Sequence, residues 1–154
     1  MGDREKTVWK IVLGTVAGFL ALFLLTGVLR DRSRKAELAD WLHGLTPERM
    51  EAVLWDSSRD GADESRALTR TETERLVSVL NGLTAENLAE NKRLAGITPE
   101  YGACLTLAGK EYLLNQADAP RGQTELSFQN RQWWIESHPL SETLSGFLDG
   151  SGQD

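Results

Sequence analysis

The sequence predicts an α+β protein in which a transmembrane helix precedes a small two-layer domain. Three observations support this prediction. A run of 19 apolar or small residues without a charge lies near the N-terminus, two stretches of alternating apolar residues form hairpins further along, and amphipathic helical patterns flank the hairpins. Because helices beside an antiparallel sheet pack on one of its faces, we expect two hairpins and a further strand, covered by two or three helices.

The uncharged run covers residues 11–29, IVLGTVAGFLALFLLTGVL. A helix of that length spans roughly 28 Å, close to the thickness of the bilayer hydrocarbon, and Trp9 suits the membrane interface. A cleaved signal peptide is the alternative, but its apolar region is usually about 7–15 residues long and ends at small residues. Here the run ends in GVLRDRSRK, with no cysteine directly after it. We therefore expect an uncleaved anchor between a tail, residues 1–10, and a juxtamembrane segment, residues 30–44.

Small residues form a stripe along the predicted membrane helix. Their spacing places them on one side of a helix and includes a G-x-x-x-G pattern, which lets two helix backbones approach closely. The stripe favours self-association or pairing with another membrane helix, although such patterns also occur by chance in apolar segments. It consists of Gly14, Ala17, Gly18 and Ala21.

Charge is distributed unevenly along the chain. Residues 1–35 carry a net charge of +4 and residues 36–154 carry −10, against −6 for the whole chain. Nucleic acids attract clustered positive charge, so we expect no nucleic-acid partner for the acidic domain. Three basic residues precede the anchor and four follow it. The short basic tail favours a cytoplasmic N-terminus, which would place the domain on the extracytoplasmic side.

The soluble domain is expected at residues 45–150, before a polar tail at residues 151–154. Thr46 followed by Pro47 is typical of a helix start. Residues 50–55, MEAVLW, fit either one face of a helix or a buried strand. Six residues are too few for periodicity to decide between the two.

A capped helix is predicted next. Residues 71–74, TETE, match a capping box, and Gly82 is a plausible terminator. The following segment, residues 84–100, is polar and is expected to be irregular. The apolar face of the predicted helix consists of Leu76, Val79, Leu80 and Leu83.

Alternating apolar residues then predict the first hairpin. Ala108–Gly109 forms its two-residue turn, which places Leu105 opposite Tyr112 and Ala103 opposite Leu114. All four side chains then share one face of the sheet.

A second hairpin follows the loop QADAPRGQ. Its turn is expected around Asn130–Arg131, with Phe128 opposite Trp133 and Leu126 opposite Ile135. Pro139 then opens a last amphipathic helix, whose apolar side consists of Leu140, Leu144, Phe147 and Leu148.

The order of these patterns resembles that of small domains in uncharacterised membrane-anchored proteins and lipoproteins of Gram-positive bacteria. The T-x-x-E helix, YGACLTLAGKEYLL, ELSFQNRQWWIES and the short final helix carry the resemblance, over residues 45–148. It is a similarity of pattern without a diagnostic motif. It implies a fold and an anchored setting, and it brings no catalytic residue or activity.

The stretch WDSSRDGADES begins like an EF-hand calcium loop. Asp56 takes its first position and Glu64 its ninth, and positions 3, 5 and 6 carry suitable residues, whereas Asp63 stands at position 8, which is normally apolar. The twelfth position requires a bidentate Glu and is occupied by Ala67. Exposed turns use the same Asp, Ser and Gly residues. A calcium-dependent binding module using the Asp56–Glu64 loop is therefore an alternative function, and a charged turn is the simpler interpretation.

Catalytic and metal-binding patterns are scarce. His43 and His138 lie far apart in the chain, and Cys104 is the only cysteine. We expect no metal, cofactor or catalytic residue, although a small enzyme using Cys104 or a carboxylate pair is a further alternative. The simpler role of Cys104 is that of a small buried strand residue.

Trp134 is the candidate interaction residue. If Trp133 faces the core, Trp134 lies on the opposite face of the sheet, across from Ser127. The same face would carry Glu125, Glu136 and Cys104 if both hairpins join one sheet. An aromatic residue on an open face can be a binding hot spot, unless residues 84–99 or the N-terminal helix cover it. We expect a non-catalytic module that binds an unidentified protein at the membrane surface.

Overall fold

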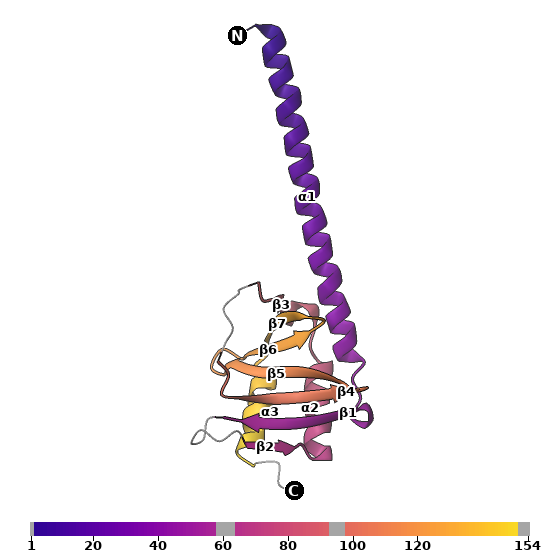
Figure 1. The fold of residues 1–154 in the computed structure, drawn as a ribbon, viewed down its shortest axis with the longest axis vertical. Coiled ribbons are helices and arrows are strands. Elements are labelled where there is room, and N and C mark those ends of the chain that lie inside the picture. Colours follow the sequence, from indigo (N-terminus) through magenta and orange to yellow (C-terminus); the bar gives the residue numbers. More distant parts are fainter. Residues whose placement is uncertain (1, 58–63, 93–97, 151–154) are drawn as a thin grey trace. The chain divides into compact units, whose positions relative to one another are not determined.

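The computed structural model describes residues 2–57, 64–92 and 98–150 of the chain, and within residues 3–6 it describes the backbone alone. The chain divides into two compact units, residues 1–36 and 37–154. The helix α1, Asp3–His43, is 41 residues long and contributes to both units (Figure 1).

The apolar part of α1 confirms the predicted N-terminal helix. Among the described residues, α1 is the one helix long and apolar enough to cross a membrane, with a window of mean hydropathy 2.4. Its apolar side chains are exposed, including Phe19 at 70% and Phe23 at 75%. Water would solvate such a surface poorly, whereas hydrocarbon would solvate it well.

The remainder of the chain has the predicted α+β fold. Its described strands form one seven-stranded sheet in the order β2-β1-β4-β5-β6-β7-β3, and every neighbouring pair is antiparallel. Both predicted hairpins belong to this sheet. The strands are β1 (Met50–Asp56), β2 (Glu64–Ala67), β3 (Leu88–Glu90), β4 (Tyr101–Leu107), β5 (Lys110–Asp118), β6 (Gln123–Phe128) and β7 (Arg131–Glu136).

Residues 50–55, whose type the sequence left open, form a strand. Met50, Ala52 and Leu54 are buried on one face of β1, and the residues between them are more exposed. The expected helix start at Pro47 is a single 3-10 turn, Pro47–Arg49, that leads directly into the strand.

The prediction that residues 84–100 are irregular is wrong for part of that segment. A 3-10 turn at Ala85–Asn87 leads into β3, which pairs with β7 at the edge of the sheet. Leu88 is 2% exposed and lies opposite Ile135. Three residues are too short for a visible alternation, so pairing with β7 stabilises a strand that the local sequence does not specify.

The first hairpin has the predicted register, with Leu105 opposite Tyr112 and Ala103 opposite Leu114. Its turn residues both have positive φ, 50° at Ala108 and 76° at Gly109. That backbone is the usual one for a two-residue hairpin turn.

The second hairpin has a different register from the predicted one. Its turn is Gln129–Asn130, where φ is 51° and 59°, so Leu126 lies opposite Trp133 and Phe128 opposite Arg131. The predicted pairing was therefore wrong by two residues. A shift of two residues keeps each side chain on its face, so Trp133 still enters the core.

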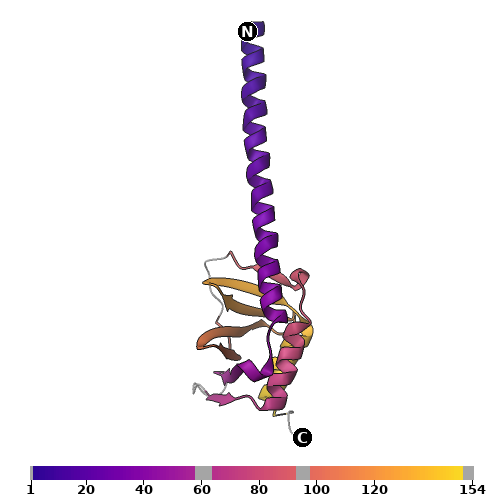
Figure 2. The ribbon, with the colours of Figure 1, turned by 90° about the vertical axis from the view of Figure 1, so that its right-hand side faces the viewer.

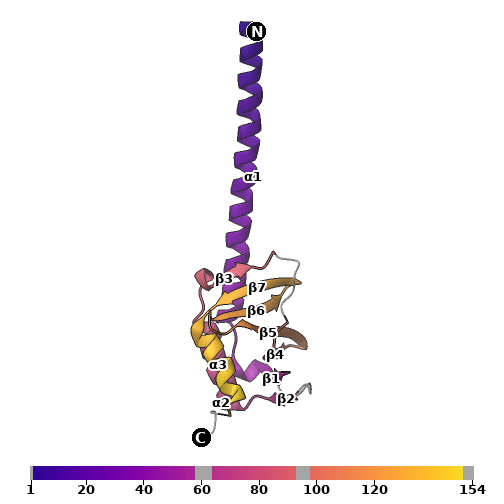
Figure 3. The same cartoon turned by 90° about the vertical axis from the view of Figure 1, so that its left-hand side faces the viewer.

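Two helices cover one face of the sheet, as Figures 2 and 3 show. They are α2 (Arg70–Asn81) and α3 (His138–Leu148). The capping box of α2 is formed by Thr69 and Glu72 rather than by the predicted Thr71 and Glu74, although Gly82 ends the helix as expected. The first turn of α3 contains Pro139 and follows the N-cap Ser137.

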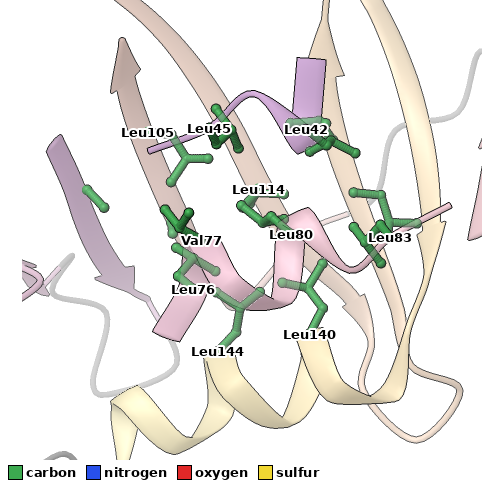
Figure 4. Packing of buried hydrophobic residues seen from close by; sticks show 14 of the residues in the cluster. Leu42, Leu45, Leu76, Val77, Leu80, Leu83, Leu105, Leu114, Leu140 and Leu144 are labelled. Atoms are coloured by element: carbon green, nitrogen blue, oxygen red, sulfur yellow. The ribbon is translucent and has the colours of Figure 1, made fainter. Parts of the chain in front are cut away.

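The core lies between these helices and the sheet, and Figure 4 shows leucines from every layer meeting in it. The end of α1 belongs to this core, because Leu38 and Leu42 are both fully buried. The ring centroid of Trp41 lies 4.6 Å from that of Tyr112 and 4.9 Å from that of Phe128. Residues 30–44 were predicted to be a juxtamembrane segment, and part of this segment thus belongs to the core of the domain.

Candidate interaction surface

The face of the sheet opposite α2 and α3 carries no described helix (Figures 2 and 3). We call it the open face. Side chains alternate between the two faces along a strand. The residues of the open face are therefore those that alternate with the buried core residues, and the register shows which of them are neighbours. On β1 and β4 to β7 they are Glu51, Val53, Trp55, Gly102, Cys104, Thr106, Glu111, Leu113, Asn115, Asp118, Gln123, Glu125, Ser127, Gln132, Trp134 and Glu136.

An apolar row crosses the first strands of the open face. Val53 pairs with Cys104, and Cys104 pairs with Leu113. Val53 is 37% exposed and Leu113 is 42% exposed. Among the described residues of the unit 37–154, these are the large aliphatic or aromatic side chains with more than a third of their surface exposed. Two exposed apolar side chains in one row, with Cys104 between them, are more informative than scattered surface leucines.

A second row lies one two-residue step further along the strands. Trp55 lies opposite Gly102, and a Cβ added to Gly102 would lie 3.0 Å from the indole ring. The missing side chain thus leaves room for Trp55 to lie across β4. Trp134 belongs to the same row, four strands away, which corresponds to about 19 Å.

Trp134 lies on the open face as predicted, together with Glu125, Glu136 and Cys104. Its cross-strand partner is Glu125, whereas the predicted neighbour Ser127 pairs with Gln132. Trp134 is half-buried, and α2 and α3 lie on the other side of the sheet. The predicted covering segment, residues 84–99, includes residues 93–97, which lie outside the described part of the chain.

Glu125 is a buried carboxylate on this face. It is 6% exposed, and its Oε2 accepts a hydrogen bond of 3.1 Å from the Asn91 side chain. No Lys or Arg of the described residues forms an ion pair with it. Removing a carboxylate from water is unfavourable unless a cation or several donors replace that water, so this group favours a cationic neighbour.

Cys104 has the wrong surroundings for a nucleophile. Partial burial raises the pKa of its thiol, and the nearby negative charge of Glu111 raises it further. A reactive cysteine needs the opposite, namely positive surroundings that favour the thiolate. The geometry thus favours a packing role for Cys104.

Each histidine lies at a helix end. His43 Nε2 lies 2.7 Å from the carbonyl oxygen of Leu83 and links the end of α1 to the segment after α2. His138 is exposed at the first position of α3. Among the described residues, no group of three or more His, Cys, Asp or Glu side chains could hold a metal ion.

The proposed calcium loop joins two antiparallel strands. Asp56 on β1 and Glu64 on β2 are direct register partners, and residues 58–63 between them lie outside the described part of the chain. An EF-hand requires a helix on each side of its loop. The interpretation of this stretch as a degenerate EF-hand is therefore wrong.

The small-residue stripe lies on α1 as the sequence predicts. A Cβ added to Gly14 or Gly18 would meet no atom within 4 Å, so the surface beside both glycines is open. Association through Gly14, Ala17, Gly18 and Ala21 stays a prediction.

Sequence reasoning did not identify Val53, Trp55 or Leu113 as surface residues. Their signal was the alternation of β1 and β5, in which each faces away from the core. Apolar residues at successive positions are also typical of a strand buried on both faces. The sequence alone therefore could not show that one face is open.

No protein-family model matches the sequence, and no curated protein matches it at a significant level. The fold is similar to the crystal structure of a putative lipoprotein from Clostridium perfringens, with a TM-score of 0.56 and 14% sequence identity. The match covers 75% of this chain and 96% of the other. Since α1 has 41 residues, a match of this length includes a large part of the α+β domain. The likeness is one of fold, to a protein described as a putative lipoprotein from a Gram-positive bacterium.

Proposed function

We propose that this protein is a membrane-anchored, non-catalytic module that binds a protein partner through the open face of its sheet. The observation that carries the proposal is the exposed pair Val53 and Leu113, which lies in the row next to that of Trp55 and Trp134 on a face without a described helix. Apolar side chains grouped in this way are typical of contact surfaces. Tryptophan is among the residues that contribute most to binding energy there.

Two observations support the membrane setting. The apolar part of α1 is long enough to cross a bilayer, and the similar fold from Clostridium perfringens is described as a putative lipoprotein, and lipoproteins are held at membranes by lipid. In the proposal α1 crosses the membrane once. The domain lies on the extracytoplasmic side, because the short basic tail favours the cytoplasm.

The non-catalytic part of the proposal is supported by the chemistry of the domain. The thiol of Cys104 has a raised pKa. The open face combines apolar and acidic side chains without a paired base or nucleophile among the described residues. Contact through α1, with a second copy or another membrane helix, would be a separate contribution to assembly.

Site-specific photocrosslinking in living cells tests the proposal. A photoreactive benzoylphenylalanine replaces Leu113 in the full chain, and a matched control carries it at Glu142, an exposed residue of α3 on the helix side. We expect a discrete protein adduct from position 113 and none from position 142. The adduct should weaken when Trp134→Ala is added.

Two outcomes would contradict the proposal. Equal adduct patterns from both positions would mean that the open face has no preferred partner. An adduct from position 113 that Trp134→Ala leaves unchanged would mean that the contact does not use this face as described. The melting temperature of the Trp134→Ala chain serves as the folding control.

A further inference from the structure

We infer that the partner presents a cationic amphipathic helix to the open face, with an apolar side on Val53 and Leu113 and with Lys or Arg at its flanks. This inference rests on the proposed function and specifies the chemistry of the partner. It follows from the charge pattern of the face, from the spacing of its rows and from the position of Glu125 beside Trp134.

The charge of the open face has one sign. Among the described strand residues that face this side, the ionisable side chains with a charge at neutral pH are Glu51, Glu111, Asp118, Glu125 and Glu136. Asp118 lies at the end of β5 and pairs with Arg121 of the following loop. Each described Lys or Arg of these strands instead projects from the other face of the sheet, the face that α2 and α3 cover.

Nearby arginines point to the helix side of the sheet. Arg66 is the register partner of the buried Leu54, and its guanidinium pairs with Glu72 of α2 at 2.6 Å. Arg131 is the partner of Phe128 and pairs with Glu90. Both cations are therefore occupied away from the open face, and its carboxylates keep their negative field for a partner.

The rows of the open face match the width of a helix. Glu51 and Glu111 flank Thr106 in one row, the apolar row with Val53 and Leu113 comes next, and the row of Glu125 follows. Adjacent rows are two residues apart along the strands, so the two acidic rows are separated by about 14 Å. A helix with side chains is about 10–12 Å wide. It can lie across the strands on the apolar row and extend basic side chains to both sides.

Glu125 and Trp134 form a place for one of these cations. They are direct cross-strand partners, so the two side chains project from neighbouring positions on the open face. Glu125 is 6% exposed, and among the described residues no basic side chain pairs with it. A Lys or Arg above the ring would gain a cation–π contact and the attraction of the carboxylate together.

The same charges argue against a lipid surface as the occupant. Anionic headgroups attract clusters of Lys and Arg, whereas the ionisable groups of the open face are carboxylates. A face with this charge would be repelled by an anionic bilayer and attracted by a basic protein segment.

Charge variants in the photocrosslinking experiment test the inference on the full chain. The photoreactive residue stays at position 113, and the test chain carries Glu51→Gln with Glu111→Gln. The matched control carries Glu86→Gln with Glu142→Gln, two exposed carboxylates away from the open face. We expect the test pair to reduce the adduct yield about threefold to tenfold, since each exposed pair contributes modestly, and the control pair to leave it unchanged. Mass spectrometry of the adduct should identify a peptide with Lys or Arg on both sides of an apolar stripe.

The outcomes separate the inference from the proposed function. An adduct of unchanged yield in the Glu51→Gln, Glu111→Gln chain, or a crosslinked peptide without basic residues, would overturn the cationic helix and leave a protein contact in place. An adduct with a second copy of this chain would contradict the inference that the partner is a separate protein with a cationic helix. If the chain without the charge substitutions gives no protein adduct at position 113, or gives adducts with lipid alone, both proposals are overturned.

Discussion

Arg66 joins three elements through one guanidinium group. Its Nη1 and Nη2 donate to the carboxylate of Glu72 at 2.8 and 2.6 Å, and Nη2 also donates to the carbonyl oxygen of Phe147 at 2.8 Å. The backbone N–H of Thr69 donates to the same carboxylate at 2.8 Å. The Arg66 guanidinium, together with the hydrogen bonds from Thr69, holds the pKa of Glu72 at about 2. The hydrogen bonds of Arg66 thus link β2 to the start of α2 and to the end of α3.

Replacing Glu72 with Gln should lower the free energy of unfolding by roughly 1–3 kcal/mol, because Arg66 loses its charged partner at a buried position. Urea denaturation at neutral pH measures the change. Since folding depresses the pKa of Glu72, its contribution is fully present above its ordinary value of 4.5 and is lost as the pH falls toward about 2. The difference between the two chains should therefore shrink over that window.

The matched control is Glu74→Gln, which breaks the exposed pair between Glu74 and Arg70. We expect this change to leave the stability almost unchanged, because water and salt screen a pair as exposed as this one. Equal losses for Glu72→Gln and Glu74→Gln would show that the pair between Arg66 and the buried Glu72 has no special role.

Gly102 is required by the close packing of the open face. A Cβ at this position would lie 2.1 Å from the carbonyl oxygen of Leu114 and 3.0 Å from the Trp55 ring. We predict that Gly102→Ala lowers the free energy of unfolding by about 1–3 kcal/mol and changes the tryptophan fluorescence as Trp55 moves. Denaturation and emission spectra measure both effects.

Gly82→Ala is the control for this substitution. Its added Cβ would lie 3.4 Å from the nearest atom, the carbonyl oxygen of Val79, and its φ is −80°. We expect no loss of stability, and a small gain is compatible with the reduced freedom of the unfolded chain. A Gly102→Ala protein as stable as the Gly82→Ala protein would contradict the packing described for Trp55.

At the scale of elements, the two hairpins show what sequence patterns can specify. The first register was predictable because Gly109 marks a two-residue turn between alternating residues. The second was not, because Gln129 and Asn130 adopt positive φ without a glycine. The face of each side chain was still predicted, since a shift of two residues preserves it.

The edge strands were beyond sequence reasoning for a different reason. All four residues of β2, ESRA, are exposed, so no apolar alternation marks them. They become a strand by pairing with β1, and β3 does so by pairing with β7. A strand that is stabilised mainly by pairing with its neighbour needs no sequence pattern of its own that would predict it.

The end of α1 acts as an element of the α+β domain. Leu38 and Leu42 are fully buried, and the Gln129 side chain donates to Glu37 Oε1 at 2.7 Å. Burying a leucine contributes about 2 kcal/mol or more, and removing one leaves a cavity.

Two truncated chains test this role. A chain that begins at Glu37 should unfold cooperatively, and a chain that begins at Leu45 should be several kcal/mol less stable or fail to fold, because it lacks Leu38 and Leu42. Thermal and urea unfolding of both chains compares them. Equal stability would mean that α1 contributes nothing to the domain core.

At the scale of the whole molecule, the chain combines an apolar helix with an acidic domain. The sequence predicted the helix, the fold class and the position of Trp134 on the face opposite the core. It did not identify the apolar row of Val53 and Leu113, because which side the helices cover depends on the assembled domain. The candidate surface is thus a product of the fold as much as of the sequence.

The side of the membrane on which the domain lies can be measured directly. We predict that a thiol introduced by Ser151→Cys, in a Cys104→Ser chain, reacts with an impermeant maleimide in intact cells, because the domain is proposed to be extracytoplasmic. Cys104→Ser alone is the control without a thiol. Labelling that requires permeabilised cells would place the domain in the cytoplasm.

The accessibility of the open face in native membranes tests the central claim most directly. Leu113→Cys and Glu142→Cys, each in the full Cys104→Ser chain, are labelled with a maleimide in native membranes and again after purification into nanodiscs. A bound partner should slow labelling at position 113 about tenfold or more in native membranes and leave the rate at position 142 unchanged. Equal rates at position 113 in both settings would show that nothing occupies the open face and would contradict the account.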